Sequence, residues 1–121
     1  MNTKNATNFA AHILRKLARK YYRKSDLPPG FLVRVTKIKE LGYVEFGNKQ
    51  KIKAGSKKHK HAPCIRFAKW TRRAPRIMHG TAIHEIAHLH LWWKYEYLGH
   101  GRRFNKEMLR LAKLGAQNGV W

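Results

Sequence analysis

Apolar and polar side chains near the N-terminus repeat with the period of an α-helix. Apolar residues recur at every fourth position, at Phe9, Ile13, Leu17 and Tyr21, which places them on one helical face. The pattern predicts a helix over residues 8–24 that stops before Pro28-Pro29-Gly30. Arg and Lys between residues 15 and 24 form a basic stripe on the opposite face. Such a helix can lie on an anionic membrane, but its lack of Trp favours packing against a protein core.

The following segments have the period of β-strands. Residues 31–39 alternate between apolar and mostly basic side chains, which predicts a half-buried strand. Residues 43–46 come soon after, and we expect the two segments to pair as a hairpin. Residues 64–68 (CIRFA) predict another short strand. The stretch 47–61 is polar, basic and contains glycine, which predicts an exposed loop or a ragged hairpin tip.

The C-terminal half returns to helical patterns. Ala74-Pro75 introduces the strongest helical segment, residues 76–93, and a last helix is expected over residues 103–114. The order of helix, strands, helix and helix predicts an α+β fold with a small antiparallel sheet of two to three strands. Because the chain contains no repeat and no linker, we expect one domain over residues 1–121.

The composition narrows the class of protein. A hydrophobic fraction of 43% with 4 Trp, 5 Tyr and 5 Phe argues against a disordered basic tail. Cys64 is the single cysteine, which excludes a disulfide scaffold and a cysteine-based zinc ribbon and fits a reducing compartment. No apolar run approaches the roughly 18 residues of a membrane span, and the N-terminus lacks the core of a signal peptide. We therefore expect a soluble, cytoplasmic monomer, nucleoid-associated or, in a eukaryote, nuclear.

The charge indicates a polyanionic partner. The chain has 27 Lys and Arg against 6 Asp and Glu, a formal net charge of +21. The basic residues cluster in 15–24, 49–60 and 66–76 with few acidic residues between them, which favours binding of DNA or another nucleic acid over a merely solvated surface. The pattern leaves single-stranded and double-stranded DNA open. Candidate contacts are basic residues near an exposed loop and around a possible stacking residue: Lys57, Lys58, Lys60, Trp70, Arg72 and Arg73.

A zinc-binding motif lies within the strongest helical segment. His84, Glu85 and His88 form a complete H-E-x-x-H sequence. A step of four residues turns a helix by about 400°, so the two histidines point the same way and can bind one metal ion. Glu85 projects beside that face, where it can reach a water on the metal without being a ligand.

Catalytic zinc has three protein ligands, so a third residue is needed. His100, held in Gly99-His100-Gly101, is the first candidate because the glycines allow a close approach of the backbone. Glu96 is a less favoured candidate. The spacing of the metzincins is absent, because Leu91 and Lys94 stand where that pattern has Gly and His. His90 is interpreted as a supporting or core residue.

These motifs resemble the SprT-like zinc metalloproteases, the group that includes the Spartan proteases acting on DNA–protein crosslinks. The resemblance rests on the helix HGTAIHEIAH (79–88), the run LHLWW and the motif GHGRRF (99–104). It implies a minimal zincin-like metalloprotease domain with His84, His88 and His100 as zinc ligands. It also implies Glu85 as the acid/base that activates a zinc-bound water, and proteins bound or crosslinked to DNA as substrates. The cysteine-rich ribbon of bacterial relatives and the long C-terminal regions of Spartan are missing from this sequence.

Other interpretations of the sequence stay open. A non-enzymatic nucleic-acid-binding protein could use a closed structural zinc site, with Cys64 or a further histidine as fourth ligand. A basic interaction protein that has lost its metal site and a zinc nuclease are further alternatives. The sequence does not identify a second group to stabilise an oxyanion; the candidates are Arg73, Tyr95 and Tyr97.

Overall fold

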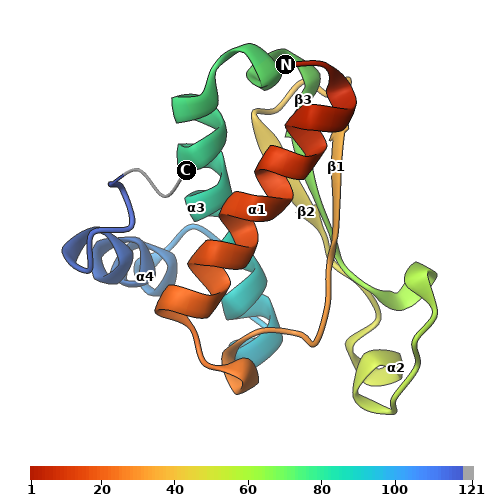
Figure 1. Ribbon diagram of the computed structural model, residues 1–121. Coiled ribbons are helices and arrows are strands. Elements are labelled where there is room, and N and C mark those ends of the chain that lie inside the picture. The colour runs from red at the N-terminus through yellow and green to blue at the C-terminus, as the bar shows by residue number, and fades with distance from the viewer. Residues whose placement is uncertain (119–121) are drawn as a thin grey trace.

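The computed structural model describes residues 1–118 (Figure 1). Its long elements form an α+β fold, as the sequence predicts. Within the described residues there are four α-helices and a sheet of three strands: α1 (Thr3–Tyr21), β1 (Leu32–Thr36), β2 (Gly42–Glu45), α2 (Lys49–Lys53), β3 (Cys64–Ala68), α3 (Pro75–Tyr95) and α4 (Arg102–Lys113). In this part of the chain no helix is both long and apolar enough to cross a membrane.

The sheet is mixed, and the prediction of an antiparallel sheet built on a hairpin between the first two strands is wrong. The strand order is β1-β3-β2; β1 pairs with β3 in parallel and β2 pairs with β3 in antiparallel fashion. The most apolar strand takes the centre, because Ile65 and Phe67 of β3 are fully buried. The strands β1 and β2 carry exposed Arg34 and Glu45, which suit edge positions.

One face of the sheet forms the core with the helices. Val33, Val35 and Val44 lie in register with Ile65 and Phe67 and share their face. The helices α1 and α3 pack against each other and against this face, with α4 on α3 at one side and α2 at the far end of the sheet (Figure 1). The opposite face carries both polar and apolar side chains and includes an ion pair of 2.6 Å between Arg66 and Glu45.

The helix α1 begins earlier than its apolar period predicts. Asn2 caps it by accepting a hydrogen bond of 2.7 Å from the N–H of Asn5. The first turn is polar except for Ala6, which is completely buried. The apolar side of α1 packs on the core as expected, and its basic stripe faces outward.

The segment expected to be an exposed loop contains the short helix α2. Asn48 caps this helix through a hydrogen bond of 3.1 Å from the N–H of Lys51. Ile52 is buried and joins the core. One apolar residue among many lysines is too weak a pattern to predict a helix, because no second apolar residue marks its period.

The helix α3 is the centre of the molecule and is buried on most sides. Pro75 stands at its first turn, where a missing N–H costs nothing. It ends at Glu96, which adopts a left-handed conformation with φ of 55°. The helix α4 then starts at Arg102 and turns Phe104 and Leu111 onto α3. The loop between the two helices therefore returns the chain to the middle of α3, where the H-E-x-x-H motif lies.

Candidate metal centre

Three histidine side chains from two segments meet at one point. His84 and His88 come from consecutive turns of α3, and His100 comes from the loop before α4. Their Nε2 atoms are separated by 3.1 Å (His84 to His88), 2.9 Å (His88 to His100) and 3.3 Å (His84 to His100). The structure thus brings together the three residues that the sequence analysis selected as metal ligands.

This triangle of nitrogens fits a metal ion better than it fits hydrogen bonds. A neutral imidazole Nε2 is either a donor or an acceptor, and each N–H points at one partner. Three mutual contacts among three such atoms therefore include at least one repulsive pair. Nitrogens that bind one tetrahedral zinc ion at about 2.0–2.1 Å lie roughly 3.3 Å from one another. The observed separations are close to that value.

Phe104 of α4 packs against all three imidazole rings. Its ring stacks on His88 with centroids 4.4 Å apart and an angle of 20°. It meets the rings of His84 and His100 edge to face, at 4.8 Å and 4.9 Å. Phe104 is 5% exposed, so it is a rigid wall. This packing fixes the ring orientations of residues that are 16 positions apart.

The surroundings favour the neutral form of His84 and His88, which is the form that binds metal. Burial lowers the pKa of His88 to about 4, with further lowering by the positive charges that His84 and His100 would carry. Burial also lowers the pKa of His84, as does the neighbouring His100. Neutral imidazoles offer a lone pair at Nε2 without first having to lose a proton.

The loop that carries His100 is held by Tyr97. The hydroxyl of Tyr97 accepts a hydrogen bond of 2.8 Å from the N–H of Gly101. A Cβ atom at Gly101 would lie only 2.5 Å from that hydroxyl, so a side chain here would force Tyr97 or the loop to shift. The two glycines beside His100 permit a close approach, and the approaching group is the hydroxyl of Tyr97.

Glu96, the other candidate for third ligand, lies away from the histidines. Its side chain is 77% exposed and forms an ion pair of 3.5 Å with Lys49. Among the described residues, the cluster of potential ligands contains the three histidines alone. Cys64 is buried in β3 and is not part of it. His90 is also buried, and its Nδ1 lies 2.8 Å from the carbonyl oxygen of Asp26, so it is a core residue.

Glu85 is buried beside the metal-binding face of α3. The residue is 4% exposed, and a Cβ built on Gly42 of β2 would lie 3.2 Å from its Oε2 atom. Its carboxyl group makes no hydrogen bond or ion pair to any other residue of the range 1–118. Burial raises the pKa of this carboxyl group to about 7. Such a group exchanges protons readily near neutral pH.

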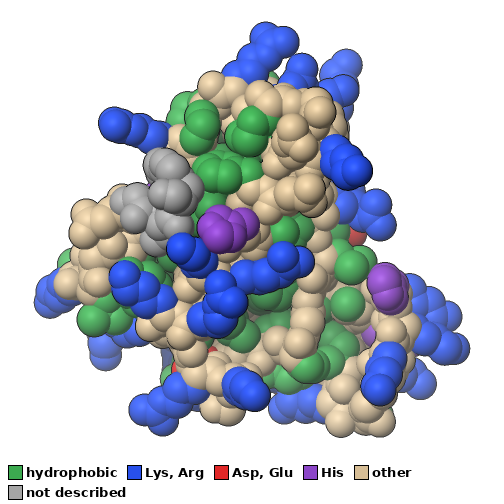
Figure 2. Space-filling view, in the orientation of Figure 1, with side chains coloured by type: hydrophobic (Ala, Val, Ile, Leu, Met, Phe, Trp, Pro, Cys, Tyr) green, Lys and Arg blue, Asp and Glu red, His purple; other side chains and the backbone are tan. Residues whose placement is uncertain are grey.

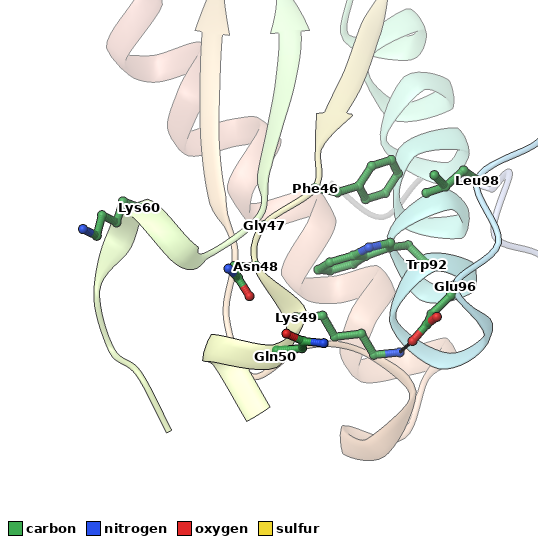
Figure 3. A pocket seen from close by; sticks show the side chains of 9 residues that line it. All are labelled: Phe46, Gly47, Asn48, Lys49, Gln50, Lys60, Trp92, Glu96 and Leu98. Atoms are coloured by element: carbon green, nitrogen blue, oxygen red, sulfur yellow. Dashed lines mark hydrogen bonds and ion pairs between the residues drawn. The ribbon is translucent and has the colours of Figure 1, made fainter. Parts of the chain in front are cut away.

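A cleft lies beside the C-terminal end of α3, and its lining residues do not include His84, His88 or His100. Trp92 lies one turn after His88, and Leu98 precedes His100 by two residues. These two side chains and Phe46, which follows β2, form its apolar part (Figure 3). Lys49 crosses the cleft mouth toward Glu96. The sequence gives little sign of this cleft, because its walls come from three separate segments.

The predicted nucleic-acid contacts do not form one surface. Lys57, Lys58 and Lys60 are exposed in the connection before β3, whereas Trp70, Arg72 and Arg73 belong to the 3₁₀ turn η3 (Lys69–Arg73) after it. The length of β3 separates the two groups. Trp70 is 50% exposed. Lys and Arg side chains project over much of the α1 face with few acidic side chains among them (Figure 2).

The three candidate oxyanion donors also differ in position. Arg73 lies in η3, and the ring of Tyr95 packs under the guanidinium of Arg103 at 4.5 Å. Tyr97 alone of the three is bonded into the loop that carries His100.

Comparisons with models of known protein families, with curated proteins and with solved structures give no match to this chain.

Proposed function

We propose that this chain is a zinc-dependent endopeptidase of the SprT-like type that cleaves proteins bound or crosslinked to DNA. The observation that carries the proposal is the meeting of three histidine Nε2 atoms within 3.3 Å of one another, next to a buried glutamate of the same helix. The H-E-x-x-H spacing and the GHGRRF motif supply the likeness to the SprT-like group.

The number and exposure of the ligands favour a catalytic rather than a structural site. Structural zinc is normally enclosed by four protein ligands, whereas catalytic zinc has three and a free position. Within residues 1–118 three histidines form the cluster, and His100 is exposed to solvent. A small molecule such as water has access to this side of the cluster.

The histidines and Glu85 can take separate roles in peptide hydrolysis. His84, His88 and His100 would hold the zinc ion, which supplies a Lewis acid and lowers the pKa of water toward about 7. Glu85 accepts a proton at its carboxylate and returns it to the amine of the departing peptide. Its burial, without a competing hydrogen-bond partner, leaves that carboxylate available.

The strand β2 offers a place for the peptide substrate. It is an edge strand in the order β1-β3-β2, and exposed strand edges bind extended peptides through main-chain hydrogen bonds. Gly42 at its start lies against Glu85, and Phe46 after its end lines the cleft. A peptide added to this edge therefore passes from the general base to the cleft. The net charge of +21 would hold the enzyme near substrates on DNA.

The test is cleavage of a DNA-bound protein by the zinc-loaded chain and by Glu85→Gln. We expect the variant to retain zinc and to lose activity by at least about 10²-fold, the usual contribution of general acid–base catalysis. Glu40→Gln is the matched control, because this exposed glutamate belongs neither to the histidine cluster nor to the lining of the cleft. It should cleave at the wild-type rate.

Equal activity of wild type and Glu85→Gln would contradict the proposed mechanism. Stoichiometric zinc without any Glu85-dependent hydrolysis would instead support the non-enzymatic nucleic-acid-binding protein with a structural zinc site.

A further inference from the structure

A second hollow lies beside the C-terminal end of α3 and shares no lining residue with the cleft at Trp92. It has a volume of about 740 Å³ and is formed by the C-terminal part of α1, the segment that leads to β1, and Trp93. Its floor is apolar and largely aromatic: Tyr22, Leu27, Phe31 and Trp93. None of the predicted nucleic-acid contacts lies in it.

The rim of this hollow is positively charged. Arg19, Arg23 and Lys24 line it, and all three side chains are exposed. No Asp or Glu is among the residues that line it. Figure 2 shows apolar surface beneath the lower part of α1 among Lys and Arg side chains. The acidic residue of this segment, Asp26, lies outside the lining and is paired with Lys94 and with the N–H of Arg23. The exposed cations of the rim favour an anionic ligand.

Trp93 has further cations above its ring. The Nζ atoms of Lys49 and Lys53, both from α2, lie 5.7 Å and 5.6 Å from its centroid. Phe31, Tyr22 and Trp93 are each partly exposed at the edge of the core. Aromatic faces surrounded by cations can bind a flat apolar group that is attached to negative charges.

A nucleotide of a single strand has this combination of properties. Its base stacks on aromatic side chains, while the adjoining phosphates pair with Arg and Lys. A base inside a duplex is already stacked on its neighbours and cannot enter a hollow. A purely apolar peptide would leave the rim cations without partners.

We propose that this hollow binds a base of single-stranded nucleic acid, with Phe31 and Trp93 as stacking residues and Arg19, Arg23 and Lys24 as phosphate contacts. The inference deepens the proposed function by naming the form and the site of its nucleic-acid partner. Trp93 is adjacent to Trp92 of the cleft, with ring centroids 5.9 Å apart, and Lys49, which lines the cleft, lies over the ring of Trp93. A strand held here lies beside the cleft for the peptide.

The experiment compares two labelled oligomers of equal length and charge, oligothymidylate and the same backbone without bases. The wild-type chain should bind oligothymidylate about 5- to 150-fold more tightly, the usual range for stacking of one base. Trp93→Leu should remove most of this difference while it retains binding to the base-free backbone. Trp70→Leu tests the other candidate stacking residue, which is exposed in η3; loss of the difference in this variant and not in Trp93→Leu would overturn the proposal.

The outcomes separate this inference from the proposed enzyme activity, because binding is measured without cleavage and can use Glu85→Gln. Circular dichroism establishes that each variant is folded, and Trp93→Phe, which retains an aromatic face, should restore base-dependent binding. Equal affinity of the wild type for the two oligomers would overturn the proposal. So would an acidic peptide with aromatic residues that binds more tightly than oligothymidylate and depends on Trp93, because the hollow would then serve a protein partner.

Discussion

The candidate metal centre and the basic surface formed by Lys57, Lys58 and Lys60 hold their side chains in different ways. In the metal centre, three imidazoles from two segments pack on one phenyl ring, and their Nε2 atoms lie within 3.3 Å of one another. On the basic surface, the side chains of Lys57, Lys58 and Lys60 are exposed and make no hydrogen bond or ion pair within residues 1–118. The three imidazoles are therefore held in place by packing without a ligand. The exposed lysines are not held by other side chains and act as separate charges.

This difference determines how each region should respond to substitution. Residues that share one packed site act together, so the removal of one disturbs the positions of the others. Exposed charges contribute separately and weakly, and salt screens them. Single substitutions should therefore have large effects at the metal centre and small effects on the basic surface.

The largest expected effect on stability comes from Phe104→Ala. Removal of a buried phenyl ring typically costs about 3–5 kcal/mol of unfolding free energy, and the three imidazoles would lose their common wall. We expect zinc affinity to fall by about 10- to 100-fold, as it does when supporting residues of metal sites are removed. Urea unfolding and zinc titration measure the two effects. Leu109→Ala, at a position of α4 that is 55% exposed, should change neither.

A somewhat smaller effect is expected from Glu107→Gln, on the side of α4 that faces α1. Glu107 accepts two hydrogen bonds of 2.8 Å from Arg110 and one from the hydroxyl of Tyr22. Loss of its charge should cost about 1–3 kcal/mol, because hydrogen bonds to a buried charged group would be weakened.

The same residue gives a pH dependence of stability. Burial opposes ionisation of Glu107, but the hydrogen bonds from Arg110 and Tyr22 outweigh it and hold the pKa of the carboxyl group below its usual value. Its stabilising contribution is thus complete above the unfolded-state pKa of about 4.3 and is lost as the pH falls through the lower folded-state pKa. Unfolding measured from pH 7 to pH 2 should show a smaller acid-induced loss in Glu107→Gln. An identical loss in both proteins would contradict this account.

Gly101→Ala should lower the free energy of unfolding by about 1 kcal/mol, because it adds an atom at a packed position. The new Cβ would lie 2.5 Å from the hydroxyl of Tyr97, so the loop that carries His100 must shift, and zinc affinity should fall. Tyr97→Phe in the same chain removes the clashing oxygen and should restore part of that affinity. The matched control is Gly80→Ala in α3, where a Cβ meets nothing within 4 Å and should stabilise the helix by about 0.5–1 kcal/mol. A loss of zinc affinity in Gly80→Ala would contradict the explanation that Gly101→Ala acts through the loop that carries His100.

The smallest effect is expected from Lys58→Gln on the basic surface. If this lysine contacts a phosphate, the slope of log affinity for DNA against log salt should decrease by about 0.7–0.9. Zinc affinity and unfolding free energy should not change. A loss of zinc affinity comparable to that of Phe104→Ala would refute the division into an ordered centre and independent charges.

The sequence predicts best what depends on neighbours in the chain. The pairing of His84 with His88 follows from the helical period, and the helix of residues 76–93 matches most of α3. The expected hairpin between β1 and β2 is wrong, because β3 lies between them and its position depends on contacts between distant residues. The apolar pattern does not predict the start of α1, because the first turn depends on the Asn2 cap and on one buried alanine.

In the candidate site, too, the sequence predicts local features, whereas contacts between distant segments are known only from the structure. His100 was selected from its motif, and its place beside His84 and His88 is a property of the structure. The wall formed by Phe104, the contact of Glu85 with β2 and the cleft at Phe46 depend on packing between elements. Gly42 carried a weak signal, since an isolated glycine in a strand marks a close approach.

The most direct test of the central claim is a zinc titration of the metal-free protein with a competing chelator, for the wild type, His100→Ala and His12→Ala. His12 is an exposed histidine on α1 and is the matched control. We predict that the wild type and His12→Ala bind one zinc ion per chain with equal affinity, and that His100→Ala loses most of that affinity because only two ligands are left. Equal zinc affinity of His100→Ala and the wild type, or no zinc binding by the wild type, would contradict the assignment of the three histidines as a metal centre.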